Sequence, residues 1–223
     1  MLPGVIKSVS QKHGENTAYV SADARKITYS DLDRTSDEMA VWLTQKGIGE
    51  GSVAALCLPS CIEYIISYLA LAKIGSITAG INPRFTSHER ADALETLNPD
   101  IVITAKGSDA GVETKYPKTV IQLNQTDLMH SHRIKDSYPQ SLDEDDNRPV
   151  CICFTSGSSG KPKGALFTNK QLKAISDLDT GGSWGGGGHR YASTEFAHVG
   201  VMTKLPWLLA TAGTTHLVEK WNA

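Results

Sequence analysis

The sequence of 223 residues lacks the hallmarks of several protein classes. No apolar run approaches the roughly 20 residues that a membrane-spanning helix needs. The first residues, MLPGVIKSVSQKHGE, contain neither the long apolar stretch nor the small-residue cleavage site of a secretory signal. The formal net charge is -2 at pH 7, and no block of lysines or arginines is present. We therefore expect a cytoplasmic protein with no integral membrane segment and no nucleic-acid partner.

Cysteine is scarce, and its spacing argues against a metal site. The four cysteines are Cys57, Cys61, Cys151 and Cys153. The last two are separated by one residue in an apolar run, which on a strand puts both on the same face, too close for an ordinary disulfide. A zinc site would need CxxC pairs or added histidines at matching spacing. We predict buried, reduced thiols instead.

Helical spacing of apolar residues alternates with short, nearly all-apolar runs along the first two thirds of the chain. The pattern predicts helices from Ser30 to about Gly47, from 62 to about 75, and from a Thr86/Glu89 capping box to a point before Pro99. It predicts strands at 53–58, 76–81, 101–104, 119–123 and 150–154. Apolar strands alternating with helices imply a doubly wound α/β fold, with a mostly parallel sheet flanked by helices.

The chain divides into three parts by composition. We expect an α/β subdomain over 1–123, an acidic connector over 124–149, and the start of a second, incomplete α/β subdomain over 150–223. The carboxylates at 143–146 are a candidate cation site, but consecutive carboxylates on a loop are usually solvated, so we favour a solvated connector. The glycine-rich tract at 181–188 follows no predicted strand and is typical of a flexible loop.

The most informative stretch runs from Thr155 to Gly164, directly after the strand predicted to end at Phe154. It contains three glycines, four hydroxyl side chains and two lysines. Glycines let backbone amides approach a phosphate, hydroxyls donate hydrogen bonds to its oxygens, and lysines supply countercharge. A flexible surface turn, the alternative, would not need both lysines. A Walker A loop is excluded, because Thr155 and Pro162 stand where it needs a glycine and a hydroxyl residue.

Position by position, this stretch resembles the signature of the adenylate-forming (AMP-binding) superfamily, which includes acyl-CoA synthetases, aryl-CoA ligases, luciferases and nonribosomal peptide synthetase adenylation domains. Four other segments are similar to family motifs in the same order. They are Ile27 to Leu32, Leu58 to Gly75, Asn82-Pro83-Arg84, which is common in acyl-CoA synthetases, and Phe196 to Gly200, which is similar to F-H-x-x-G with Ala197 inserted. The resemblance spans nearly the whole chain and implies the N-terminal part of the adenylate-forming synthetase fold.

The resemblance also implies roles for individual residues. The residues implied to hold the β- and γ-phosphates of ATP are Thr155, Ser156, Gly157, Ser158, Ser159, Gly160, Lys161 and Lys163. His198 is implied as the catalytic residue beside the carboxylate and acyl pocket. Without the motif, one histidine beside a predicted helix at 201–209 would more often be a packed core residue. No metal ligand is implied within the chain, and the main Mg²⁺ ligand is expected downstream.

The activity implied is that of an ATP-dependent acid–CoA ligase. A fatty or aryl carboxylic acid would attack the α-phosphorus of ATP to give an acyl-adenylate, and CoA would then take the acyl group as a thioester. The motifs for adenine, magnesium and ribose do not occur in these residues, so we expect the chain alone to be inactive, as a fragment of a longer ligase or a product that has lost the rest. The alternatives are a non-catalytic nucleotide- or phosphate-binding module, an inert half of an adenylation domain, and an unrelated phosphate-binding protein, which the flanking motifs disfavour.

Overall fold

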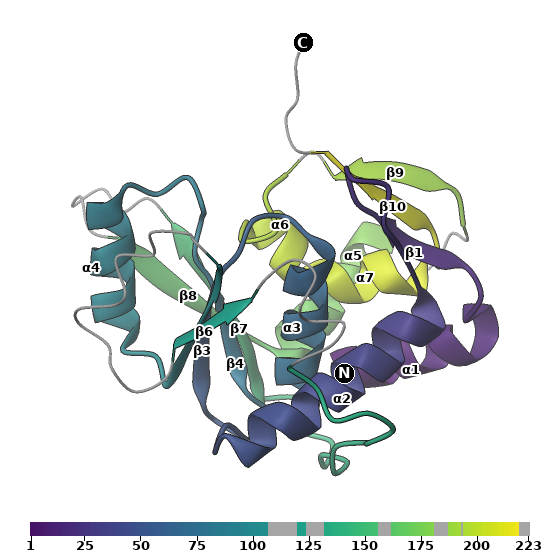
Figure 1. The fold of residues 1–223 in the computed structure, drawn as a ribbon, viewed down its shortest axis with the longest axis horizontal. Coiled ribbons are helices and arrows are strands. Elements are labelled where there is room, and N and C mark those ends of the chain that lie inside the picture. Colours follow the sequence, from purple (N-terminus) through teal and green to yellow (C-terminus); the bar gives the residue numbers. More distant parts are fainter. Residues whose placement is uncertain (107–119, 124–131, 156–161, 181–186, 193, 219–223) are drawn as a thin grey trace.

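The computed structural model describes residues 1–106, 120–123, 132–155, 162–180, 187–192 and 194–218, and Figure 1 shows their arrangement. The helices are α1 Leu2–His13, α2 Tyr29–Gln45, α3 Ile62–Lys73, α4 Ser87–Leu97, α5 Asn169–Thr180, α6 Val199–Met202 and α7 Leu205–Ala210. The strands are β1 Thr17–Val20, β2 Lys26–Thr28, β3 Val53–Cys57, β4 Ile77–Gly80, β5 Ile101–Ala105, β6 Val120–Leu123, β7 Pro149–Thr155, β8 Lys163–Thr168, β9 His189–Ala192 and β10 Thr214–Leu217.

The larger sheet has six strands in the order β6-β5-β3-β4-β7-β8. All neighbours are parallel except β8, which runs antiparallel to β7. Helix α4 lies on one side of this sheet and α3 on the other (Figure 1). On β3, Leu56 belongs to the main core, whereas Ala55 and Cys57 belong to the cluster with Leu94 of α4. Because side chains alternate along a strand, apolar residues at successive positions fill both faces, and the predicted α/β fold is confirmed.

The starts and stops of the three helices predicted between 30 and 99 are confirmed within a few residues, because they rest on local chemistry. The Thr86 hydroxyl accepts a hydrogen bond from the Glu89 amide, and the Glu89 carboxylate accepts one from the Thr86 amide, which is the predicted capping box. Gly47 follows α2 with φ of +81° and Gly75 follows α3 with φ of +72°. Glycine adopts this left-handed conformation without the cost that other residues incur.

A second sheet was not predicted. It has four strands in the order β2-β1-β10-β9, in which β10 lies parallel to both β1 and β9. The sequence gives little sign of these strands, since each has only three or four residues and their burial is mixed. The pairing of Tyr19 with Thr215 joins the two ends of the described chain. Helices α1 and α5 and strand β8 were likewise not predicted.

The single helix predicted at 201–209 is wrong, because two short helices occupy this stretch. Pro206 lies in the first turn of α7 and has no amide hydrogen, so it cannot donate to the carbonyl of Met202 as a continuous helix would require. That carbonyl instead accepts a hydrogen bond of 2.9 Å from the Tyr68 hydroxyl on α3. The break therefore ties α6 to the helix that covers the larger sheet.

The acidic connector is less solvated than predicted. In its described part, the Arg133 guanidinium lies 2.7 Å from a carboxylate oxygen of Glu38 on α2, which is only 1% exposed. The Asp136 amide donates to the other Glu38 oxygen. The carboxylates at 143–146 are exposed, as predicted. Strands from both sides of the connector pair within each sheet, and the division into subdomains stays a prediction.

Candidate functional site

The β7–β8 hairpin carries the predicted phosphate loop. Thr155 at the end of β7 stands opposite Lys163 at the start of β8, and the Thr155 hydroxyl donates to the Lys163 carbonyl over 3.4 Å. Both residues are exposed. The structure thus brings Thr155 and Lys163 together at the two ends of the loop. The other predicted phosphate-binding residues, Ser156, Gly157, Ser158, Ser159, Gly160 and Lys161, lie outside the described residues, as do 181–186 of the glycine-rich tract.

The loop end of the hairpin lies at the carboxyl ends of the parallel strands, where ligands usually bind. Because β3, β4 and β7 are parallel, their carboxyl ends meet at one edge, and the residues at or after these ends converge there. These are Ser60 after β3, Arg84 after β4, and Thr155, the last residue of β7. In open α/β sheets, the crevice outside the carboxyl ends of the strands is the common ligand-binding position.

His198 is exposed and stands directly before α6. Its Nδ1 accepts a hydrogen bond of 3.0 Å from the Gly200 amide. An accepting ring nitrogen carries no proton, so the neutral imidazole has its proton on Nε2, which is left as a donor. Neither Thr155 nor Lys163 is among the described hydrogen-bond partners of His198; the ring is held by its own segment.

Apolar packing fixes that segment on β4 and β7. Phe196 is 3% exposed, and its ring packs edge-on against Tyr64 of α3 with 5.7 Å between centroids. A Cβ atom at Gly80 would lie 2.8 Å from the Ala197 Cα, so only glycine at the end of β4 allows so close an approach. The Met202 sulfur lies 3.9 Å from the sulfur of Cys153, two residues before the end of β7. His198 therefore belongs to the same edge of the sheet as Thr155 and Lys163, the two described ends of the predicted phosphate loop.

A polar cluster at this edge was missed. The Ser60 hydroxyl donates to one carboxylate oxygen of Glu195 over 2.8 Å and accepts a hydrogen bond from the Phe196 amide over 3.0 Å. The other Glu195 oxygen lies 3.1 Å from the Arg84 guanidinium. Ser60 and Arg84 stand in segments with family resemblance, yet no local pattern predicts that Glu195 would meet them across 135 positions of sequence.

The four cysteines are free and buried, which confirms the prediction of reduced thiols. Burial raises the pKa of Cys57 to about 12 and raises the pKa of Cys61 further above its usual range. Neither is a thiolate near neutral pH, so neither is a nucleophile. Within the described part of the chain, no three His, Cys, Asp or Glu side chains come together as a metal site would require.

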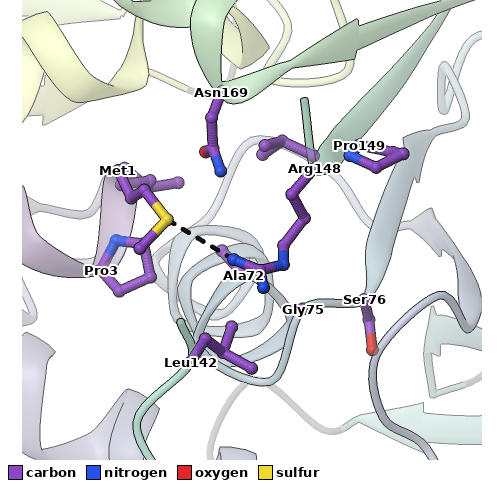
Figure 2. A pocket seen from close by; sticks show the side chains of 11 residues that line it. Met1, Pro3, Ala72, Gly75, Ser76, Leu142, Arg148, Pro149 and Asn169 are labelled. Carbon is purple, nitrogen blue, oxygen red and sulfur yellow. Dashed lines mark hydrogen bonds between the residues drawn. The ribbon is translucent and has the colours of Figure 1, made fainter. Parts of the chain in front are cut away.

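A small pocket, shown in Figure 2, is lined by residues other than those of the candidate site. It is lined by Ser76, just before β4, and Pro149, the first residue of β7, so it lies at the amino ends of these strands. The Arg148 guanidinium reaches the Met1 sulfur at 3.6 Å, a Glu50 carboxylate oxygen at 2.9 Å and the Asp143 carbonyl at 2.7 Å. Through Arg148, Met1 at the start of the chain is held close to the first residue of β7.

Comparison with known protein sequences places the chain in context. The family model described as AMP-binding enzyme matches residues 6–223. HC-toxin synthetase of Cochliobolus carbonum is 29% identical over 165 residues, which cover 73% of this chain and 3% of that protein. 4-Coumarate–CoA ligase 1 of Solanum tuberosum is 27% identical over 164 residues, which cover 68% of this chain and 29% of that protein. The chain thus spans under a third of the length of these relatives.

Solved structures share the fold. The inhibitor-bound N-terminal domain of FACL13 from Mycobacterium tuberculosis matches 99% of this chain and 57% of its own, with a TM-score of 0.85 at 19% identity. The N-terminal subdomain of Klebsiella oxytoca NpsA, in complex with 3-hydroxybenzoyl-AMSN, matches 99% of this chain and 54% of its own, with a TM-score of 0.79 at 20% identity. At such identities the likeness establishes the architecture. No helix in the described part of the chain has both the length and the apolar character to cross a bilayer.

Proposed function

Because the chain belongs to the AMP-binding enzyme family, we propose that it supplies the phosphate-binding and acid-facing part of an ATP-dependent acid–CoA ligase. The observation that carries this proposal is the convergence of the Thr155–Lys163 hairpin and the His198 segment at the carboxyl edge of one sheet. The reaction joins a carboxylic acid to AMP, releases pyrophosphate, and transfers the acyl group to a thiol.

The hairpin fits the polyphosphate of ATP. Lys163 is exposed at the loop end, where its ammonium group can face phosphate oxygens, and the Thr155 hydroxyl can donate to them once it leaves the Lys163 carbonyl. By the family resemblance, we propose that residues 156–161 bind the phosphates as well. Charge-assisted hydrogen bonds of this kind are about twice as strong as neutral ones. When magnesium is bound, it neutralises further phosphate charge; the described residues bring together no ligand set for it.

His198 is proposed to orient the acid. Its Nε2–H can donate to one carboxylate oxygen, while the other oxygen attacks the α-phosphorus in line with the departing pyrophosphate. In this step the new carboxylate–phosphorus bond forms as the bond to the pyrophosphate oxygen breaks. Catalysis of such a displacement consists mainly of positioning and charge stabilisation. A histidine fixed through Nδ1 by Gly200 suits that positioning role.

Two observations favour CoA over a carrier-protein thiol as the acyl acceptor. The Asn82-Pro83-Arg84 segment is similar to acyl-CoA synthetases, and relatives include a 4-coumarate–CoA ligase. The second candidate is an adenylation domain that loads a carrier protein, which is supported by relatives named as nonribosomal peptide synthetases, such as the dimodular nonribosomal peptide synthase of Bacillus subtilis. Both share the adenylation step. They differ only in the thiol that accepts the acyl group.

The test measures ATP–pyrophosphate exchange by the full-length protein that the gene encodes. Fatty, aryl and amino acids are supplied one at a time as the carboxylic acid substrate. We expect exchange with at least one acid, and formation of its CoA thioester when CoA is added. Exchange without thioester formation would favour the carrier-protein alternative. ATP binding without exchange by any acid would support a non-catalytic nucleotide-binding module and contradict the ligase. The 223-residue chain assayed alone is expected to give no exchange.

A further inference from the structure

The polar cluster of Ser60, Arg84 and Glu195, here called the Glu195 clamp, lies beside the proposed acid-binding residue. Glu195 is three positions before His198, and its carbonyl accepts the His198 amide hydrogen bond over 2.9 Å. The clamp joins the loop after β3, the loop after β4, and the segment that leads into α6. Three separate parts of the chain thus meet at the turn that carries the histidine.

Ser60 holds this turn by two bonds. Its hydroxyl donates to the Glu195 side chain and accepts from the Phe196 backbone amide, so both the side chain and the main chain of the turn are tied to the loop after β3. Each polar atom named here has a partner, and the carboxylate charge faces the Arg84 guanidinium. A satisfied polar network of this kind specifies one geometry for the segment.

The clamp contributes more to position than to stability. The side chains of Arg84 and Glu195 are 76% and 26% exposed, and ion pairs between exposed groups stabilise a fold only slightly. The apolar contacts beneath, made by Phe196 with Tyr64, already attach the segment to the core. What remains for the clamp to determine is where the exposed side of the turn lies, and that side carries the His198 ring.

We propose that Glu195, anchored by Ser60 and Arg84, is a positioning residue that sets the place of His198 relative to the bound carboxylic acid. The proposal rests on the proposed function for its consequence in catalysis, but the link between the clamp and the turn can be tested on the chain itself. Small displacements of a positioning group are costly in enzymes, since reacting atoms must be held close and aligned.

The first experiment measures amide hydrogen exchange in the 223-residue protein. Ser60→Ala and Glu195→Ala are expected to speed exchange of the Phe196 amide by roughly ten-fold, because local opening becomes easier when the polar anchor is lost. Glu144→Ala, which removes the same charge from an exposed connector position, is the matched control and should leave Phe196 unchanged. Unaltered exchange in both clamp variants would overturn the proposal.

The second experiment measures ATP–pyrophosphate exchange in the full gene product. Glu195→Ala should raise the KM for the acid by about ten-fold and leave the KM for ATP within about two-fold, since only the acid-facing group is displaced. Glu195→Gln keeps an oxygen for Ser60 but loses the charge opposite Arg84, so its effect should be smaller. Arg84→Lys keeps a cation opposite Glu195, so its KM for the acid should stay close to the wild-type value.

A parallel rise in both KM values together with a lower melting temperature would mean that Glu195 only supports the fold, and the proposal would be wrong. If the wild-type protein shows no exchange with any acid, the proposed function fails. The hydrogen-exchange result then decides alone whether the clamp holds the turn.

Discussion

The two sheets of this molecule differ in how clearly the local sequence pattern indicates their strands. In the six-stranded sheet, β3, β4 and β5 are short apolar runs separated by helices, and β3 is buried at four of its five positions, whereas the edge strand β8 is largely exposed. Strands of the four-stranded sheet have three or four residues and mixed burial, and β1 pairs with β10 nearly two hundred positions away, as in the pairing of Tyr19 with Thr215. The central strands of the first sheet are specified by local pattern, whereas the pairing of β1 with β10 in the second depends on contacts that only the folded chain makes.

Helix α6, which directly follows His198, lies between the two sheets (Figure 1). The β7–β8 hairpin forms one edge of the larger sheet. The His198 segment lies in the sequence between β9 and β10, two strands of the smaller sheet. The His198 segment contacts the larger sheet at Gly80, the last residue of β4, which packs closely against Ala197. The candidate site therefore depends on the larger sheet and on a connection of the smaller one, and the following substitutions test the two separately.

The largest effect is expected in the larger sheet. Leu56→Ala empties a fully buried position in its central strand and should lower the free energy of unfolding by about 3–5 kcal/mol. Leu217→Ala, at the end of β10 with 6% exposure, should cost only about 2–3 kcal/mol, because its surroundings can relax more easily. Urea unfolding of both variants measures the difference, and Leu178→Ala at an 83% exposed position serves as control. Equal losses would mean that the two sheets are equally packed.

The next effect is expected where the His198 segment contacts the larger sheet. In Gly80→Ala the new methyl group would lie 2.5 Å from the Met202 sulfur and 2.8 Å from the Ala197 Cα, so the 197–202 segment must shift. Such overpacking typically costs about 1–3 kcal/mol. Gly4→Ala in α1 meets nothing within 4 Å and should instead stabilise by roughly 0.5–1 kcal/mol, since alanine favours a helix. Thermal unfolding of the pair checks the opposite signs, and a neutral Gly80→Ala would show that this contact is loosely packed.

A smaller effect concerns pH and the smaller sheet. The Tyr29 hydroxyl donates to the Gly213 carbonyl just before β10, and burial raises the pKa of Tyr29 from 10.0 to about 12. A folded-state pKa above the unfolded value means that the stabilisation is complete below pH 10 and is lost as pH rises towards about 12. Melting temperatures should therefore fall across this interval. Tyr29→Phe should cost about 1 kcal/mol at neutral pH and flatten the alkaline decline; an unchanged slope would assign the decline to other groups.

The features that could be predicted from the sequence are those set by neighbouring residues, whereas several of the features that were missed depend on contacts between distant parts of the chain. Capping residues such as Thr86 and Glu89, and glycines such as Gly75, act on their immediate neighbours, so helix ends could be predicted. The place of Thr155 at the end of a strand followed from the apolar run before it, whereas the return strand β8, which pairs Lys163 with Thr155, was not predicted. The break before Pro206 was missed although the proline is visible in the sequence, because the apolar spacing from 201 to 209 suggested one helix.

The Glu195 clamp could not have been predicted from spacing. Ser60 and Glu195 meet only because β3 and β4 lie side by side and the His198 segment crosses their carboxyl ends. A glutamate in a loop has no local signal that distinguishes it from the exposed carboxylates of the connector. Such long-range polar contacts depend on tertiary structure, and the structure alone identifies them.

The central claim, that the Thr155–Lys163 hairpin faces the ATP phosphates, is tested most directly by comparing half-reactions in the full gene product. Lys163→Ala should slow the adenylation step by roughly 10- to 100-fold, since it removes a charge-assisted contact, and should barely affect transfer to CoA from a supplied acyl-adenylate. Lys173→Ala, at an exposed position on α5, is the matched control and should change neither step. Equal losses in both half-reactions for Lys163→Ala would contradict the assignment of this residue to the phosphates.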